Sequence, residues 1–280
     1  VFKSLVDPQG ASNEGWFRPV EIICPDGTVF TAQKPAATGW YYEGSAHASE
    51  LVWKALAEIS PDRFSAGSYM SLCATYVYGK DPESGEIFVH IEPAVGGWGA
   101  TSKRDGTAAL IATTDGDTYN YSVELFEAKF PLYVRQYALN TEEGVGAGRY
   151  RGGFGAVREF EILADEAITY ASFGRTGEPP WGLKRGAVGS CNFMEIESGD
   201  QTQRVARIPY HALKSGDRLR VVTGGGGGYG DAFERPAQEV LEDLRNDYIT
   251  PKTARDKYGV ALTPDGAVDE AATEALRAGR

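Results

Sequence analysis

A run of five glycines constrains the fold of this chain more than any other feature of its sequence. Residues 221–236 read VVTGGGGGYGDAFERP. Glycine loses more backbone freedom on folding than any other residue, so an ordered run of it is costly. Residues 225–230 also fit the G-x-G-x-x-G pattern of dinucleotide-binding loops, but that pattern opens a helix, whereas residues 231–236 are acidic and turn-like. We therefore expect a structural role, in which the run adopts positive φ values and approaches another segment closely.

Charge and hydropathy exclude several classes of partner. The 280 residues include 28 Lys and Arg against 39 Asp and Glu, which gives a formal net charge of −11. Nucleic acids and anionic membrane surfaces are bound by basic faces, so neither is an expected partner. No apolar stretch approaches the roughly 18 residues of a membrane span, and the first residues lack a signal-peptide pattern, so we expect a cytoplasmic protein.

The cysteines and histidines are too widely spaced for a disulfide framework or a zinc site. They are Cys24, Cys73, Cys191, His47, His90 and His211. Zinc sites in proteins combine closely spaced His and Cys ligands, and disulfide frameworks use an even number of cysteines. We therefore expect this chain to bind no metal by itself.

The pattern of apolar residues predicts an α+β fold with a mostly β-rich core. Residues 45–59 carry apolar side chains at spacings of three and four, which predicts one internal amphipathic helix, capped by Ser45 or Ser49 and ended by Pro61. A Pro-Asp-Gly turn within residues 20–31 predicts a hairpin. Further strands are predicted at residues 87–93, 108–114, 132–139, 157–163, 168–172, 193–196, 204–208 and 219–223, and a short helix at residues 122–129.

The composition changes after Gly230. Residues 235–280 are rich in Ala, Glu, Asp and Arg. Their spacing predicts three short helices, the second of which starts with an N-cap and a proline at Thr250-Pro251. We therefore divide the chain into a β-rich region, residues 1–234, and a short helical tail, residues 235–280, that packs on this region or on a partner.

One candidate site lies in the stretch DGDTYNYSVE, residues 115–124. It gathers Asp115, Asp117, Asn120 and Glu124. Carboxylates and an amide can orient a polar substrate or bind a cation, although the spacing is not that of a calcium loop. The alternative is a turn that leads into a helix, because Asp and Asn favour turns and caps for local reasons.

A second candidate site is the loop GVGAGRYRGGFG, residues 144–155, which holds Arg149 and Arg151. Two planar guanidinium groups on such a loop can hold a phosphate or a carboxylate through paired hydrogen bonds. The alternative is a turn whose arginines pair with some of the surplus carboxylates. The sequence contains no GxxxxGK[ST] loop and no GxSxG motif, so neither an ordinary ATP site nor a serine nucleophile is expected.

Several stretches together resemble one protein family. They are NEGWFRP at 13–19, GGWGA at 96–100, TDGDTYNYSVE at 114–124, GRYRGGFGAVREF at 148–160, PPWG at 179–182, SGDRLRV at 215–221, GGGGGYGD at 224–231 and KYGVAL at 257–262. Their order and spacing resemble the C-terminal half of the hydantoinase B/oxoprolinase family. Members of that family are usually much longer, and in its carboxylases the N-terminal half carries His and Asp metal ligands that this sequence lacks.

The resemblance implies an ATP-dependent enzyme of several subunits. A hydantoinase A-like partner with an actin-like ATPase fold would bind ATP and Mg and phosphorylate a carbonyl oxygen of a small-molecule substrate. A second partner would supply the N-terminal half of the B component, and the resemblance allows Zn or Mn in a partner. In such a complex residues 224–230 would be a close-packing loop between the strands and the tail, with a second role at a subunit interface left open.

Three functions are compatible with the resemblance. The first is a subunit of an amidohydrolase that opens a hydantoin, a lactam or a related cyclic amide, which is the broader branch of the family. The second is a subunit of an acetone- or acetophenone-type ketone carboxylase, and the third is a non-catalytic scaffold. In an active complex Asp115, Asn120 and Glu124 would orient amide groups or a water, and Arg149 and Arg151 would position the phosphorylated substrate. The isolated chain is expected to be inactive.

Overall fold

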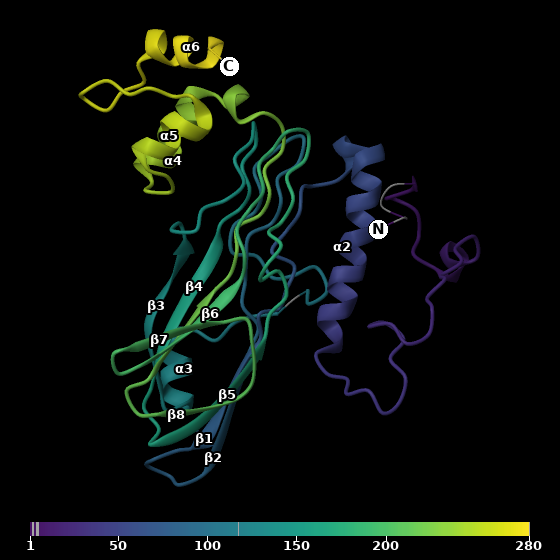
Figure 1. Cartoon of the computed structure of the whole chain (residues 1–280), viewed down its shortest axis with the longest axis vertical. Helices are drawn as coiled ribbons and strands as arrows, with labels where there is room; N and C mark the ends of the chain where they lie inside the picture. Colours follow the sequence, from purple (N-terminus) through teal and green to yellow (C-terminus); the bar gives the residue numbers. More distant parts are fainter. Residues whose placement is uncertain (2, 4–5, 117, 280) are drawn as a thin grey trace.

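Two antiparallel sheets form the body of the molecule in the computed structural model, which describes residues 1, 3, 6–116 and 118–279. The first sheet has the strand order β2-β1-β5-β8 and the second has the order β3-β4-β9-β6-β7 (Figure 1). The strands are β1 (Thr75–Lys80), β2 (Ile87–Glu92), β3 (Leu132–Asn140), β4 (Gly155–Ile162), β5 (Glu166–Ser172), β6 (Phe193–Ser198), β7 (Gln201–Val205), β8 (Arg207–Lys214) and β9 (Arg218–Val222). The predicted α+β class with a β-rich core is confirmed.

The two sheets share one apolar core. Val77 and Phe88 of the four-stranded sheet belong to the same buried cluster as Leu132 and Leu219 of the five-stranded sheet. Phe126 of the short helix α3 (Val123–Lys129), which the sequence predicts, closes this core. Because successive side chains of a strand point to opposite faces, β2 and β5 bury every second residue.

The predicted internal helix is α2 (Tyr41–Ile59), which stands beside the sheets (Figure 1). It ends at the predicted residue but begins earlier, with Trp40 at its N-cap in the left-handed conformation (φ 54°). Ser45 and Ser49 lie inside the helix and donate their hydroxyls to the carbonyls of Tyr42 and Ser45, so the predicted caps are wrong.

The predicted hairpin near the N-terminus does not form. Gly27 N donates to Thr31 O at 3.1 Å, which closes the expected turn, but no strand flanks it among the described residues. Ile22 and Val29 are 84% and 85% exposed, and an isolated hairpin with no surface to pack on is marginally stable at best. The short 3-10 helix η1 (Glu14–Phe17) is the one named element of residues 7–39.

Two strand predictions in the body also differ from the structure. Residues 108–114 form only a single bridge, between Leu110 and Gly96, because Ala109 has a left-handed backbone (φ 47°) that interrupts an extended run. Residues 204–208 span the end of β7 and the start of β8. β1 is not predicted by the sequence, since Gly79 inside it weakens the strand pattern.

Glycine-rich segments pass one another between the sheets and the C-terminal helices. We call these segments, residues 96–99, 144–155, 180–190 and 224–230, the glycine layer. A Cβ atom added to Gly227 would lie 1.9 Å from Trp181 O, and one added to Gly226 would lie 2.1 Å from Trp98 O. Real Cβ atoms do not approach backbone atoms so closely, so only glycine fits. The predicted close approach is therefore confirmed.

The conformation of the glycine run differs from the prediction in one respect. Gly230 has a positive φ of 76°, whereas no residue of the run 224–228 does. The amides of the run are also fully used. Their N–H groups donate to Asn192 Oδ1, Ser190 Oγ, Gly153 O, Gly67 O and Ala187 O at 2.7–2.9 Å. Because no amide of this buried run remains for a phosphate, it does not act as a dinucleotide loop.

The tail contains the 3-10 helix η3 (Ala232–Glu234) and the helices α4 (Ala237–Arg245), α5 (Pro251–Tyr258) and α6 (Glu270–Ala278). Thr250 caps α5 by accepting a hydrogen bond from Thr253 N, and Pro251 is its first residue, as predicted. Val240 and Tyr258 pack on Ala147 of the glycine layer, so the tail docks on this layer. The division of the chain at residue 234 stays a prediction. No helix of the described residues has the length and apolarity that crossing a membrane requires.

Candidate binding pocket

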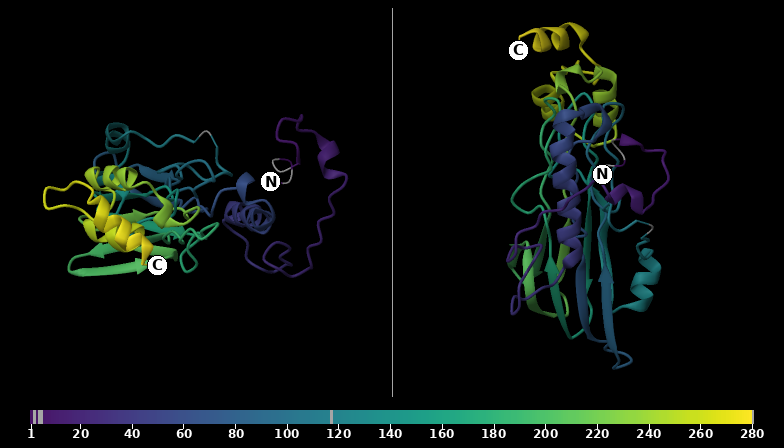
Figure 2. Two further views of the ribbon diagram at one scale, coloured as in Figure 1. Left: turned by 90° about the horizontal axis from the view of Figure 1, so that it is seen from above. Right: turned by 90° about the vertical axis from the view of Figure 1, so that its right-hand side faces the viewer.

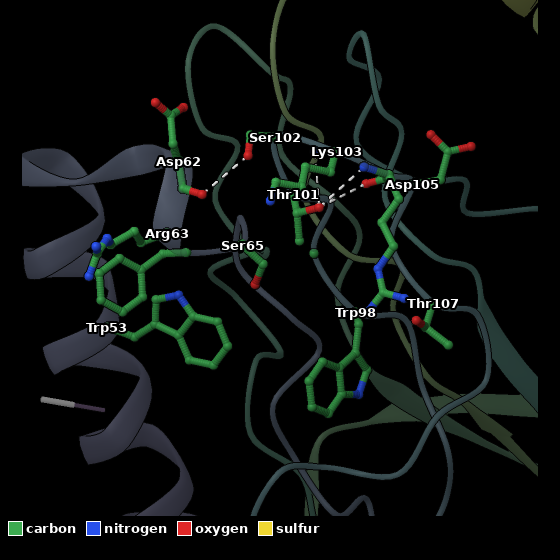
Figure 3. Close-up of a pocket in the computed structure, with 13 residues that line it drawn as sticks. Trp53, Asp62, Arg63, Ser65, Trp98, Thr101, Ser102, Lys103, Asp105 and Thr107 are labelled. Atoms are coloured by element: carbon green, nitrogen blue, oxygen red, sulfur yellow. Dashed lines mark hydrogen bonds between the residues drawn. The ribbon is translucent and has the colours of Figure 1, made fainter. Parts of the chain in front are cut away.

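A pocket of about 340 Å³ opens between α2 and the loop after the GGWGA motif (Figure 3). Its walls come from Trp53 of α2, from η2 (Pro61–Arg63) with the two residues after it, and from residues 98–107. This volume lies at the lower end of the range found for small-molecule sites.

Hydrogen bonds fix the loop that forms one wall of the pocket. Lys103 N and Arg104 N both donate to Thr101 Oγ1 at 3.2 Å, and Ser102 Oγ donates to Asp62 O at 3.2 Å (Figure 3). Trp98 Nε1 donates to Ile111 O at 3.0 Å, which orients the indole. The loop is therefore held to η2 on one side and to the body on the other.

Both carboxylates of the pocket are engaged by other parts of the chain. Asp62 Oδ1 accepts a hydrogen bond from Tyr229 OH at 2.7 Å, which ties the pocket to the glycine layer. Burial, together with this bond, raises the pKa of Tyr229 to about 12. Asp105 accepts hydrogen bonds from Arg151 N at 2.9 Å and from the guanidinium of Arg235.

The cations of the pocket differ from most other arginines of the molecule in their partners. Arg63, Lys103 and Arg104 line the pocket, and all three are exposed. Within the described ranges, no carboxylate forms an ion pair with Lys103 or Arg104, although the chain has a surplus of carboxylates. Cations with this freedom suit an anionic ligand such as a phosphate or a carboxylate.

The predicted Arg151 lies directly behind the pocket. Its Nε donates to both oxygens of Asp243 at 3.0 and 3.1 Å, and Arg235 Nη2 donates to Asp243 Oδ2 at 3.0 Å. Together with Asp105 these side chains form an ion-pair network that joins the pocket wall to α4. The guanidinium of Arg151 is thus held by a carboxylate of its own chain.

The predicted Arg149 lies outside the pocket lining. Its Nη1 is 3.5 Å from both carboxylate oxygens of Glu239, and its guanidinium stacks 4.8 Å from the centre of the Tyr150 ring. These contacts agree with the alternative in which the arginines of this loop pair with surplus carboxylates. A role for Arg149 and Arg151 in positioning a substrate stays a prediction.

The predicted polar cluster does not line the pocket, and Asp117 lies outside the described residues. Asp115 is part of a turn, with its amide donating to Ala112 O at 3.0 Å, and Asn120 Nδ2 donates to Pro93 O at 2.8 Å. Glu124 is exposed in the first turn of α3, where hydrogen bonds from its own amide and from Ser122 lower its pKa. These contacts are those of a turn that leads into a capped helix. A catalytic role for Asp115, Asn120 and Glu124 stays a prediction.

β2 holds a buried polar group that the sequence pattern does not single out. His90 is 2% exposed and packs against the rings of Phe126 and Phe160. Burial, with the charge of Arg158, lowers the pKa of His90 to about 3, so it is neutral near neutral pH. Within the described ranges no three His, Cys, Asp or Glu side chains are arranged to hold a metal ion.

The site residues that the sequence motifs do not predict fall into two groups. Lys103 and Arg104 lie three and four residues after the end of the GGWGA motif, so two adjacent cations near a glycine motif are a signal that the sequence does contain. Arg235 and Asp243 carry no such signal. They meet Asp105 only because the tail folds back on the glycine layer.

Fold and pocket define an α+β protein in which a glycine layer joins a body of two sheets to a helical tail, beside a pocket suited to an anion. The chain belongs to the hydantoinase B/oxoprolinase family, whose model matches residues 1–232. This finding confirms the family resemblance of the sequence motifs.

The relatives include components of amide-hydrolysing enzymes. The chain is 31% identical over 268 residues to a protein of Pseudomonas sp. (strain NS671) assigned as the B-type subunit of a D-/L-hydantoinase, and the match covers 95% of this chain and 44% of the relative. It is 34% identical over 284 residues to the beta subunit of caprolactamase from Pseudomonas jessenii. This match covers 95% of the present chain and 47% of the beta subunit. The crystal structure of ATP-dependent caprolactamase from Pseudomonas jessenii matches 99% of this chain and 50% of that chain, with a TM-score of 0.85 and 28% identity. The chain thus spans about half the length of these relatives.

Proposed function

We propose that this chain is one half of the B component of an ATP-dependent amidohydrolase that opens a hydantoin, a lactam or a related cyclic amide. One observation carries the proposal. Nearly the whole chain, 99%, shares its fold with half of an ATP-dependent caprolactamase chain. Two relatives above 30% identity are named for hydantoin and caprolactam, which is why we place ketone carboxylation second.

The proposal divides the chemistry among three polypeptides. A hydantoinase A-like partner binds ATP and Mg and phosphorylates the carbonyl oxygen of the amide. A polypeptide equivalent to the N-terminal half of a B component completes the hydrolytic site, with Zn or Mn as a metal that it can supply. The present chain binds and orients the activated substrate and remains inactive alone.

The pocket supports this division of labour. A phosphorylated carbonyl carries negative charge on its phosphoryl oxygens. Cations held close to these oxygens stabilise the charge while the phosphoryl group is transferred or released. Lys103 and Arg104 are placed to make such contacts, because their side chains form no ion pair within the described part of the chain. Two further groups of residues remain proposed for positioning the substrate. The phosphate would be positioned by Arg149 and Arg151, and the amide or a water by Asp115, Asn120 and Glu124.

Product analysis of a reconstituted complex tests the proposal. The chain is co-expressed with a hydantoinase A-type subunit and an N-terminal-half B-type polypeptide, and the purified complex is given hydantoin or caprolactam with ATP. We expect ATP-dependent ring opening that is independent of bicarbonate. Turnover that requires bicarbonate and a ketone would instead support the carboxylase, and ring opening at the same rate without this chain would support the scaffold.

A further inference from the structure

Helix α2 carries apolar side chains on two opposite faces. Ala46 and Ala57 are 1% and 0% exposed and lie against the body. At about 100° per residue, Leu51, Ala55 and Ile59 fall on the opposite side of the helix. We call these residues, together with Val52, the outer stripe of α2. The exposed fractions of Leu51, Val52 and Ile59 are 60%, 49% and 79%.

The face that α2 turns toward the body contains a buried charge. Besides two alanines it contains Glu50, which is 2% exposed and accepts a hydrogen bond from Ser68 N at 2.9 Å. Arg175 forms an ion pair with the same carboxylate. The helix therefore docks through two alanines, a buried ion pair and the partly buried Trp53, whose ring packs on Phe64. Leu51, Val52 and Ile59 are nevertheless exposed, which departs from the usual arrangement of a surface helix, in which the apolar side chains face the core.

The outer stripe is not the only exposed apolar feature on this side of the molecule. Residues 7–39 run beyond α2 on the side away from the sheets (Figure 2). Phe17, Ile22 and Ile23 in this segment are 71%, 84% and 82% exposed. Large exposed apolar side chains on one side of a soluble protein suit a binding interface.

We propose that the outer stripe of α2 binds the polypeptide that corresponds to the half of the family relatives that this chain does not match. The proposal rests on the proposed function, in which that half is a partner. In the caprolactamase, the fold seen here makes up 50% of one chain and its match covers 99% of the present chain, α2 included. The rest of that chain needs a surface on this half to pack against.

The chemistry of the stripe fits such a partner. Interfaces between parts of one enzyme have an apolar centre and a polar rim. The flanking Lys54 and Glu58 carry one charge of each sign, so the rim favours neither a cationic nor an anionic ligand and the centre selects an apolar protein surface.

A matched pair of substitutions tests the proposal. The chain is co-expressed with the unmatched half of the beta subunit of Pseudomonas jessenii caprolactamase, and the complex is purified through a tag on the chain. Leu51→Glu places a charge in the stripe. Leu125→Glu places the same charge on α3, which is separated from α2 by the strands in both views of Figure 2. Leu51 and Leu125 are 60% and 63% exposed, so both variants should keep the thermal unfolding midpoint of the wild type.

We expect a one-to-one complex with the wild-type chain and with Leu125→Glu, and a reduction of at least about tenfold in recovered complex with Leu51→Glu, since burying one charge in an apolar contact costs more than about 1.4 kcal/mol. Equal recovery of both variants would overturn the placement of the interface while leaving the proposed partner intact. A complex that does not form even with the wild-type chain would count against the partner itself. If the wild-type chain forms homodimers and Leu51→Glu is monomeric, the stripe binds a second copy of this chain and the proposal is overturned.

Discussion

Arg235 and Asp105 face each other through two parallel hydrogen bonds, Nη1 to Oδ1 at 2.7 Å and Nη2 to Oδ2 at 2.8 Å. Arg235 follows η3 at the start of the tail and its side chain is 3% exposed, whereas Asp105 lies in the wall of the pocket. Asp243 of α4 accepts a further hydrogen bond from Arg235. The position of the tail and the shape of the pocket are therefore set by the same pair.

Removing this guanidinium should destabilise the fold strongly. Arg235→Ala leaves Asp105 without the guanidinium that pairs with it and removes one of the two arginines that bind Asp243, and breaking a buried pair in this way costs about 3–5 kcal/mol. Urea unfolding measures the loss. The matched control is Arg185→Ala, because Arg185 pairs with Asp231 but is 74% exposed, and exposed pairs contribute under about 1 kcal/mol. Similar small decreases in the free energy of unfolding for both variants would show that the ion-pair network does not hold the tail.

The glycine layer should tolerate no added methyl group. Gly226→Ala would bring a Cβ atom to 2.1 Å from Trp98 O, so the backbone must move and we expect a loss of about 3 kcal/mol or more, seen as reduced soluble yield and a lower urea midpoint. Gly177→Ala is the control, because a Cβ atom there meets nothing within 4 Å, and its effect should stay under about 1 kcal/mol. A fully stable Gly226→Ala protein would contradict the packing described for this layer.

His90 should make the fold sensitive to acid. The unfolded chain binds a proton on this imidazole near its usual pKa of 6.5, whereas the folded chain keeps it neutral down to about pH 3. The stability that depends on neutral His90 is therefore complete above pH 6.5 and is lost as the pH falls toward 3, by up to roughly 1.4 kcal/mol per pH unit. In His90→Phe the free energy of unfolding should fall less steeply between about pH 6 and pH 4, as urea titrations at each pH would show. Equal slopes for variant and wild type would mean that His90 takes up its proton in the folded state.

The pocket cations should matter for turnover. In the reconstituted complex, Lys103→Ala combined with Arg104→Ala should lower ATP-dependent ring opening by roughly 10²-fold, the effect of losing a contact to developing charge, while the mass of the complex stays unchanged. The same assay applies to Arg149→Lys and Asp115→Asn. Near-wild-type rates for these two variants would show that Arg149 and Asp115 do not act in the site. A near-wild-type rate for the double variant would show that the pocket does not bind the substrate.

The sequence predicts local structure well where the signal is local. Thr250 and Pro251 define the start of α5 because a cap and a proline act within one turn. The same periodicity that predicts α2 cannot tell which face is covered, and Leu51 and Ile59 turn out to face away from the body. That choice depends on tertiary contacts such as the pair between Glu50 and Arg175.

The candidate site was harder to predict than the fold. The glycine-rich loop around Arg151 predicts an anion site, but the partners of this arginine, Asp243 and Asp105, lie far away in the sequence. A single sequence gives no sign that these residues meet. The glycine run predicts close packing because no other residue fits there. Which segments it contacts follows only from the three-dimensional arrangement.

The central claim is that this chain is a required half of a larger ATP-dependent hydrolase. The most direct test measures ring opening of hydantoin and caprolactam and the release of ADP by three preparations: the chain alone, the complex without the chain, and the complete complex. We predict that only the complete complex opens the ring and that its activity depends on ATP. ATP hydrolysis by the chain alone, or ring opening at full rate by the complex that lacks it, would contradict this role.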